Sequence, residues 1–381
     1  MNKIQGLLAT TVLAASVGFA SAGHAQGNQG QGQQQSQNRG NPGQNAMQGQ
    51  GSERVALPPA LQAAMLSGNA QAVQQAINTL SAGNPQQAAS LASQVVRAAE
   101  QMLSTNPQAA IRAAAAAVET VRSSGVQQSA PQQTESVVTA AARIFVSPSA
   151  QRAAPEGAAQ LASAVMQVAA TTGNPTLTAT VSNQAVSMAE SILAVAPAAA
   201  VQVAATAVQT VQQMPITQNA PQTAMQVATT AARIIIQPEA QRVNPQAVAS
   251  IAQSSVQIAS NPAVYQTAPA SAIGVMANAY AAATSQTVVN AAPGVTGSVR
   301  ETLVTASQTN SLNQSNPANP AAINTILSGV NPSTGQPLVV ANNQSNGQSN
   351  NQADNQSNTP ANNQPNIPIP QENRIFTASP S

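Results

Sequence analysis

The chain has 381 residues, of which only 6% are charged: 12 are Lys or Arg and 10 are Asp or Glu, so the formal net charge is +2. The arginines are scattered and aromatic residues make up 1%. Nucleic-acid-binding proteins usually cluster basic residues on one face and add aromatic residues for stacking, so we do not expect nucleic acid as a partner. The chain contains no cysteine, which excludes disulfide stapling and leaves the fold dependent on packing.

The first 25 residues have the pattern of a secretory signal peptide. Lys3 supplies the positive charge, an apolar stretch follows over residues 4–20, and small residues then provide a cleavage site. The alternative is an N-terminal membrane anchor, although the apolar stretch is short for a span of ~20 residues. Cleavage would remove the only lysine and the only histidine, His24. The predicted location is secreted or periplasmic, in the cell envelope.

Two segments are too polar to build a core. Residues 26–52 are largely Gln, Gly and Asn, and residues 311–381 are largely Asn, Gln, Ser and Pro with brief apolar stretches. Neither buries enough apolar surface to offset the entropy lost on ordering, so we expect both to be disordered. Between them we predict a helical repeat domain over residues 53–310.

Prolines preceded by Asn or Ala punctuate this domain at nearly regular steps of 22, 24, 24, 20, 22, 24, 24, 24 and 24 residues. Proline suits the first turn of a helix, because its missing N–H has no helical partner there and its φ is already helical. We therefore predict about ten short helices, each beginning at one of these prolines. The series is Pro85, Pro107, Pro131, Pro155, Pro175, Pro197, Pro221, Pro245, Pro269 and Pro293.

The apolar pattern supports a helix after each proline. When the proline is position 1, positions 4, 7, 11 and 12 are mostly Ala, Val, Leu or Ile, which form one face of a helix with 3.6 residues per turn. Position 13 is mostly polar and carries Arg97, Arg143 and Arg233, as expected of an outward site near a helix C-terminus. Such short helices are marginal alone and must bury this face against their neighbours.

The helices belong to a longer repeat. The segment 143–152 (RIFVSPSAQR) returns as 233–242 (RIIIQPEAQR), 90 residues later because 233 − 143 = 90, and Glu100 corresponds to Glu190. Four helices thus form one duplicated unit, most simply as two antiparallel pairs of about 45 residues, a length found in HEAT and armadillo-like repeats. The motifs of those families are absent, so the analogy is architectural. The predicted fold is an all-α solenoid of either hand; a long antiparallel bundle is the alternative.

One later stretch, 191–211, is apolar enough to suggest a membrane span. Much of it is Ala, Gln202 and Gln209 interrupt it, and Pro197 lies inside it. We interpret it as parts of two helices and expect no transmembrane span in the mature chain.

Little catalytic chemistry remains in a mature chain that lacks Lys and His. Ser and Thr lose their usual activating bases, and metal sites built on His or Cys are excluded. The glutamates are spread about one per helix, whereas paired-carboxylate hydrolysis needs two together. Glu119 and Arg122 instead suit an i,i+3 pair, and Glu156 follows a helix-start proline. We expect no enzyme, catalytic residue, cofactor or metal; a Glu-based periplasmic hydrolase is kept as an alternative.

The most distinctive feature is the repeated segment of one arginine and two large apolar residues. It is either a helix end with a packed apolar cluster or a recurring interaction surface. A third copy lies near the C-terminus, within residues 373–381. We hypothesise that this tail occupies, on its own or a neighbouring molecule, a groove like the one in which the internal segment packs, and so supports self-association. The candidate interaction residues are Arg143, Ile144, Phe145, Arg233, Ile234, Ile235, Arg374, Ile375 and Phe376.

Together these features predict a secreted, non-enzymatic structural or scaffolding protein of the cell envelope or extracellular matrix. Its partner would be a protein or an envelope or matrix polymer, bound by a nearly uncharged surface whose affinity depends weakly on salt. The second hypothesis is a surface-active binder of ice, lipid or a polymer interface, because Ala/Thr-rich faces with few charges suit a weakly hydrated target. Against it, Thr does not recur at a strict helical spacing.

Overall fold

The computed structural model describes residues 57–338, which belong to one compact unit, Arg54–Ser381. The expected signal peptide (1–25), the expected disordered segment (26–52) and the C-terminal motif (373–381) lie outside the described residues.

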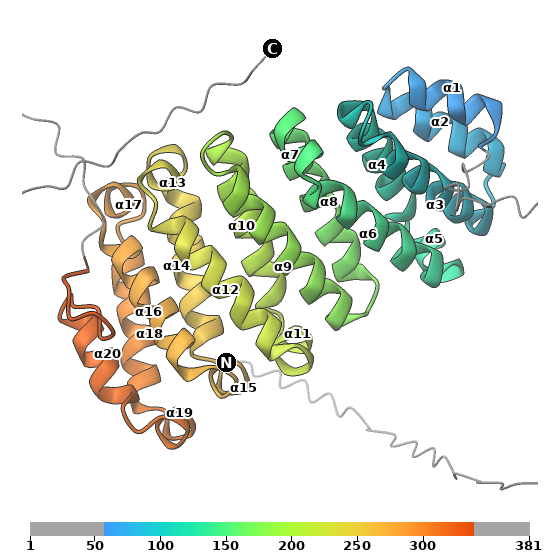
Figure 1. Ribbon diagram of the computed structural model, residues 1–381. Coiled ribbons are helices and arrows are strands. Elements are labelled where there is room, and N and C mark those ends of the chain that lie inside the picture. Colours follow the sequence, from blue (N-terminus) through green and yellow to red (C-terminus); the bar gives the residue numbers. More distant parts are fainter. Residues whose placement is uncertain (1–56, 339–381) are drawn as a thin grey trace, which may run out of the picture. The chain divides into compact units, whose positions relative to one another are not determined.

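Within residues 57–338 the chain is all-α, as the sequence predicts, with twenty helices and one isolated antiparallel bridge between Val330 and Pro337. Figure 1 shows the long helices lying side by side. The helices of eight residues or more are α1 (Pro59–Leu66), α2 (Ala70–Ser81), α3 (Pro85–Met102), α4 (Pro107–Val121), α6 (Pro131–Val146), α8 (Pro155–Thr171), α9 (Pro175–Ile192), α10 (Pro197–Val211), α12 (Pro221–Ile235), α14 (Pro245–Ala259), α16 (Pro269–Thr284), α18 (Val295–Gln308) and α20 (Asn319–Leu327). The short helices are α5 (Ser124–Ser129), α7 (Pro148–Ala153), α11 (Met214–Asn219), α13 (Pro238–Val243), α15 (Pro262–Tyr265), α17 (Gln286–Ala291) and α19 (Asn310–Ser315).

The long helices form two layers. In one layer α3, α6, α9, α12, α16 and α20 contact one another in this order, and in the other α2, α4, α8, α10, α14 and α18 do. Helices of the two layers pack as the pairs α3/α4, α6/α8, α9/α10, α12/α14 and α16/α18. Because each pair packs against the next pair along the chain, the fold is an α-solenoid.

The long helices begin at the Asn-Pro and Ala-Pro pairs, which confirms the predicted helix starts. Nine of the ten prolines are the first residue of a long helix, and the tenth, Pro293, lies two residues before α18. Where Asn precedes the proline, its side chain caps the helix: Asn84 Oδ1 accepts hydrogen bonds from the N–H groups of Gln86 and Gln87, at 3.0 and 3.2 Å. The Ala-Pro starts lack a side-chain cap.

The short helices, which the sequence analysis did not predict, account for the uneven spacing of the prolines. Each 24-residue step contains a long helix of 15 or 16 residues and then a short helix. The steps of 20 and 22 residues contain a helix of 17 or 18 residues and a turn. A helix of at most six residues shows too little apolar periodicity to be recognised in sequence. In Figure 1, α11, α15 and α19 follow one edge and α13 and α17 the other.

The core follows the predicted helix face. All ten residues at position 7 are buried, and so are those at position 12 except Val304 on α18. Many buried positions are alanines, such as Ala114, Ala162 and Ala204, all fully buried. Small side chains let helix axes approach closely, toward the lower end of the usual ~8–10 Å range.

Two helices extend the domain beyond the predicted boundary at residue 310. Leu312 on α19 and Ile323 and Ile326 on α20 are fully buried, so the expectation of disorder is wrong for residues 311–327. Their apolar stretches are too short to form a core of their own. They order because α20 packs on the existing surfaces of α16 and α18.

Candidate functional site

The two segments of one arginine and two apolar residues lie at the ends of α6 and α12. The side chains of Ile144, Phe145, Ile234 and Ile235 are fully buried. This agrees with the packed-cluster interpretation. It corrects the expectation that these four residues form an interaction surface, because their side chains are not accessible to a partner. The two arginines of these segments remain exposed.

Each arginine joins two repeats through a glutamate on the preceding helix of the same layer. Arg233 on α12 binds Glu190 on α9, with Nε–Oε1 at 2.8 Å and Nη2–Oε2 at 2.9 Å. Arg143 on α6 binds Glu100 on α3 through the same atoms, at 2.8 and 3.2 Å. The 90-residue duplication therefore includes this contact between neighbouring helix pairs.

The ion pairs favour the charged form of both arginines, which are protonated at any ordinary pH. Hydrogen bonds to Glu190 raise the pKa of Arg233 above its usual value, although burial opposes this effect, and Glu100 does the same for Arg143. The side chains of Arg233 and Glu190 are 49% and 39% exposed. An ion pair this open to solvent contributes only about 0.2–1 kcal/mol to stability. Its two-pronged geometry is more important for fixing how α9 lies against α12.

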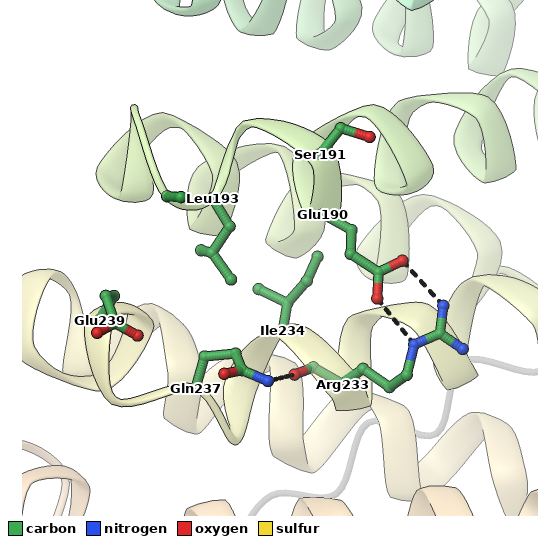
Figure 2. A pocket seen from close by; sticks show the side chains of 8 residues that line it. Glu190, Ser191, Leu193, Arg233, Ile234, Gln237 and Glu239 are labelled. Carbon is green, nitrogen blue, oxygen red and sulfur yellow. Dashed lines mark hydrogen bonds and ion pairs between the residues drawn. The ribbon is translucent and has the colours of Figure 1, made fainter. Parts of the chain in front are cut away.

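A hollow of about 460 Å³ lies beside the Glu190–Arg233 pair (Figure 2). In this view Leu193, just after α9, and Ile234, near the end of α12, extend toward each other across the hollow. Because Ile234 is fully buried, the half-buried Leu193 supplies the accessible apolar surface of the hollow, and charged groups lie at its rim. Its lining residues are Glu190, Ser191, Leu193, Ala194, Arg233, Ile234, Gln237 and Glu239.

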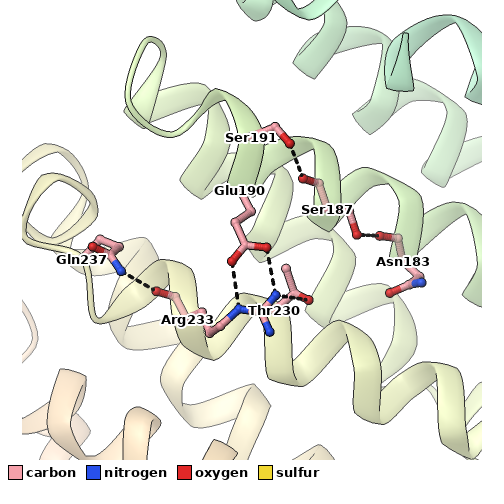
Figure 3. A network of polar contacts seen from close by, with 7 residues as sticks. All are labelled: Asn183, Ser187, Glu190, Ser191, Thr230, Arg233 and Gln237. Atoms are coloured by element: carbon pink, nitrogen blue, oxygen red, sulfur yellow. Dashed lines mark hydrogen bonds and ion pairs between the residues drawn. The ribbon is translucent and has the colours of Figure 1, made fainter. Parts of the chain in front are cut away.

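Hydrogen bonds order the polar side of this hollow (Figure 3). Besides its two bonds to Glu190, Arg233 donates from Nη2 to Thr230 Oγ1 at 3.3 Å, and its carbonyl oxygen accepts from Gln237 Nε2 at 3.4 Å. On α9, the hydroxyls of Ser187 and Ser191 donate to carbonyl oxygens four residues earlier, at 2.9 and 3.1 Å. The guanidinium is therefore held by three hydrogen bonds, and the serine hydroxyls are directed to their own helix.

Two carboxylates line this hollow, a feature that a Glu-based hydrolase would need. Each is engaged by an arginine: Glu190 by Arg233, and Glu239 by Arg242 at 3.1 Å. A general acid instead needs a carboxyl group that keeps its proton in a sheltered site. Both side chains here are more than one-third exposed and ion-paired, so the hollow lacks the environment of an acid–base pair.

A second hollow, of about 440 Å³, lies between α8 and α10. Its polar lining comes from Gln160, Ser163 and Gln167 on α8 and from Gln202 and Thr206 on α10, and the rest is Ala and Val. No charged residue lines it. Among the described residues, the amides of Gln160, Gln167 and Gln202 have no hydrogen-bond partner, which leaves their donors and acceptors available to a ligand.

The structure also bears on the remaining sequence predictions. Glu119 and Arg122 form the expected i,i+3 pair at 3.4 Å, and Glu156 lies in the first turn of α8. The stretch 191–211 comprises the end of α9, a turn and α10, which confirms its interpretation as parts of two helices. In residues 57–338 no helix combines the length and the apolarity that crossing a membrane requires. The tail residues Arg374, Ile375 and Phe376 lie outside the described residues.

Sequence reasoning recognised that Glu100 and Glu190 correspond, but it missed their arginine partners. A signal existed, because both glutamates precede their arginine by 43 residues (143 − 100 and 233 − 190), about the length of one helix pair. Leu193 and Glu239 were missed as well, because the hollow arises only when the end of α9 and α13 are brought together in the fold.

The fold and its repeated contacts define an α-solenoid built from duplicated helix pairs. Comparison of the chain with protein-family models, with curated proteins and with solved structures finds no match. Its function must therefore be inferred from the chemistry of its surface.

Proposed function

We propose that this protein is a non-enzymatic structural or scaffolding protein of the cell envelope or extracellular matrix, and that its solenoid binds a partner through the outward faces of α8, α10 and α14. The observation that carries the proposal is the uncharged hollow between α8 and α10 with its three available glutamine amides. The proposed location is supported by the signal-like sequence of residues 1–25.

Charge is nearly absent from these helices. α10 and α14 contain no charged residue, and α8 contains only Glu156, in its first turn. Each glutamine amide offers two donors and an acceptor, which suits a polymer or polypeptide with many uncharged polar groups. Such binding depends on hydrogen bonds and shape, so its affinity should change little with salt concentration.

Some other glutamines of the solenoid have structural tasks. Gln241 Nε2 donates to the carbonyl oxygen of Ile235 at 2.9 Å, and Gln212 Nε2 donates to Gln257 Oε1 across α10 and α14. Among the described residues, the amides of Gln160, Gln167 and Gln202 hold no such contact. Their position around one uncharged hollow supports the binding of a partner there.

The alternatives have less support. Outside residues 1–25 the sequence contains no Lys, His or Cys, and the two carboxylates of the larger hollow are held by arginines. A surface-active binder would need threonine hydroxyls directed outward. Those of Thr180, Thr206 and Thr229 donate instead to carbonyl oxygens four residues earlier, at 2.8 to 3.0 Å.

The proposal is tested by capturing partners from the native cell surface with the chain from residue 26 to 381 as bait. The triple variant Gln160→Ala, Gln167→Ala and Gln202→Ala should lose at least about tenfold in affinity, because several hydrogen bonds of about 0.5–1.5 kcal/mol each are removed together. The matched control replaces three exposed glutamines elsewhere, Gln75, Gln132 and Gln133, by Ala.

Two further measurements complete this test. A bait that ends at residue 338 should capture the same partner, because the binding face lies within the solenoid. Capture should also persist when the salt concentration is raised. A partner held only by the full-length bait, or one released steeply by salt, would contradict the proposal.

A further inference from the structure

The hollow beside Glu190 and Arg233 lies where the two 90-residue units differ in chemistry. Two segments border it, the turn between α9 and α10 and the helix α13, and each carries an exposed apolar residue: Val195 is 68% exposed and Val243 is 45% exposed. In the first unit the same sites are small or polar, and the acidic residue is missing. The equivalent positions, 90 residues apart, hold Thr105 and Val195, Ser149 and Glu239, and Ala153 and Val243.

These differences combine exposed apolar surface with charge at a single hollow. Leu193, which is half-buried, already provides apolar surface there, and Glu239 adds a carboxylate whose only partner among the described residues, Arg242, is an exposed neighbour one helical turn away. An exposed i,i+3 pair contributes little, so an incoming cation can replace it easily. The hollow therefore suits a peptide that carries large apolar residues next to a positive charge.

We infer that residues 372–376 (ENRIF) of the same chain dock in this hollow. Among residues 339–381, Phe376 is the only aromatic residue, and Glu372 and Arg374 are two of the three charged residues. Arg374 complements Glu239, and Ile375 and Phe376 complement the accessible apolar side chains of Leu193 and Val195. Glu372 complements Arg233, the cation at the opposite side of the rim.

The connecting chain is long enough for docking within one molecule. From residue 338 to residue 374 there are 36 residues (374 − 338), which can extend to roughly 120 Å at about 3.3 Å each. In their layer, α12 and α20 are separated by α16 alone. With neighbouring helix axes about 8–10 Å apart, the hollow between α9 and α12 is roughly 20–30 Å from α20 across the layer, well within this reach. Tethering then raises the effective concentration of the motif at the hollow.

Because the chain contains no cysteine, disulfide trapping gives a direct test. Val195→Cys and Thr377→Cys are introduced together into the full chain, and disulfide formation in mild oxidant is followed by non-reducing gel and mass spectrometry. Docking predicts a disulfide within one chain. Val195 tolerates substitution because it is largely exposed, and circular dichroism verifies that the variants are folded.

The matched control pairs Thr377→Cys with Thr287→Cys. Thr287 is exposed on α17, which contacts α13. Its disulfide therefore measures the rate at which the tail meets this edge of the solenoid by random encounter. We expect the Val195→Cys pair to form its disulfide at least about tenfold faster, because both pairs are tethered alike and only docking holds residue 377 close to residue 195. Equal rates for the two pairs would overturn the inference.

Charge reversal separates docking at this hollow from non-specific contact. Glu239→Arg should slow disulfide formation about two- to fivefold, the range expected for one exposed ion pair, and adding Arg374→Glu should restore the rate. An unchanged rate in Glu239→Arg would show that the motif does not dock in this hollow. A disulfide that forms between two chains, and faster as the protein concentration rises, would show a second copy as the occupant and would also overturn docking within the chain.

Discussion

Arg233 and Glu190 are 43 residues apart in the sequence, yet two hydrogen bonds of 2.8 and 2.9 Å join them across neighbouring helix pairs of the solenoid. Arg143 and Glu100 repeat this relationship 90 residues earlier. The contact occurs on one layer only, between α3 and α6 and again between α9 and α12. It therefore fixes alternate junctions by two-pronged ion pairs. At the junction between α6 and α9, Asn174 Nδ2 instead donates a single hydrogen bond to Glu135 Oε1 at 3.2 Å.

The first prediction concerns the strength of this contact. A double-mutant cycle with Arg233→Ala and Glu190→Ala should give a coupling energy of about 0.5–1 kcal/mol, the upper part of the range for exposed pairs, because the geometry is two-pronged. Urea denaturation measures it, and the coupling should decrease at high salt. The control cycle on Arg122 and Glu119, a single contact at 3.4 Å within one helix, should give no more than about 0.5 kcal/mol. Equal coupling in the two cycles would contradict a special role for the inter-repeat pair.

The second prediction uses the duplication itself. Asn244 and Ala154 are equivalent residues before a helix-start proline, with nearly the same backbone: φ −151° and ψ 70° for Asn244, φ −154° and ψ 70° for Ala154. Only Asn244 caps its helix, by accepting from the N–H of Ala247 at 3.1 Å. Asn244→Ala should therefore lower the free energy of unfolding by about 1 kcal/mol, and Ala154→Asn should raise it by about 0.5–1 kcal/mol. Thermal unfolding measures both. A loss of stability in Ala154→Asn would show that the two sites are not interchangeable.

The sequence was sufficient to predict the α-solenoid, because Asn/Ala-Pro starts and a 3.6-residue apolar pattern agree with each other at nine of the long helices. The burial of position 7 in all ten repeats follows directly from this pattern. The short helices could not be predicted, since six residues hold fewer than two turns. Helix α20 was missed for another reason: its order depends on the surface of α16 and α18, which the local composition does not reveal.

The site was less predictable than the fold. The arginine segments were recognised, yet whether Phe145 and Ile234 face the core or a partner depends on the rotation of the last helical turn, and the structure places both in the core. The hollow beside Arg233 forms between segments more than 40 residues apart, so its lining emerges only when α9 and α12 are adjacent. The constant separation of 43 residues between glutamate and arginine implied the ion pair that borders the hollow. It was overlooked because ion pairs are usually sought between residues three or four apart in one helix.

A buried hydroxyl gives a prediction of increased stability. Ser255 on α14 is fully buried and its Oγ has no hydrogen-bond partner, while the equivalent residue in the first unit is the buried Val165. Ser255→Ala should raise the free energy of unfolding by about 1–2 kcal/mol, because it removes an unsatisfied polar group and favours the helix. The control is Ser182→Ala on α9, where the hydroxyl donates to the carbonyl oxygen of Thr178 at 2.8 Å. That variant should gain less in urea denaturation, and a larger gain than in Ser255→Ala would contradict this interpretation.

The last prediction concerns the C-terminal end of the solenoid, where a tyrosine anchors α20. Tyr265 is fully buried; its hydroxyl donates to Asn319 Oδ1 at 3.0 Å and accepts from Asn316 Nδ2 at 3.2 Å. Tyr265→Phe leaves Asn319, itself fully buried, with an unpaired oxygen, so unfolding should become easier by about 1–3 kcal/mol. Tyr280→Phe, at a buried tyrosine without such a network among the described residues, is the control and should cost less.

This anchor also gives stability a pH dependence. Burial raises the pKa of Tyr265 above its usual value, although the hydrogen bond from Asn316 opposes the shift. The phenol therefore stays neutral in the folded chain at a pH where it ionises in the unfolded chain. Its contribution is complete below about pH 10, the ordinary tyrosine pKa, and is lost as pH rises through the folded-state value. Urea denaturation should show a constant advantage of the native chain over Tyr265→Phe from neutral pH to about pH 9, and a decreasing one above about pH 10. An advantage that stays constant through this upper range would mean that the phenol has the same pKa in the folded and the unfolded chain. It would then contradict the raised pKa of Tyr265.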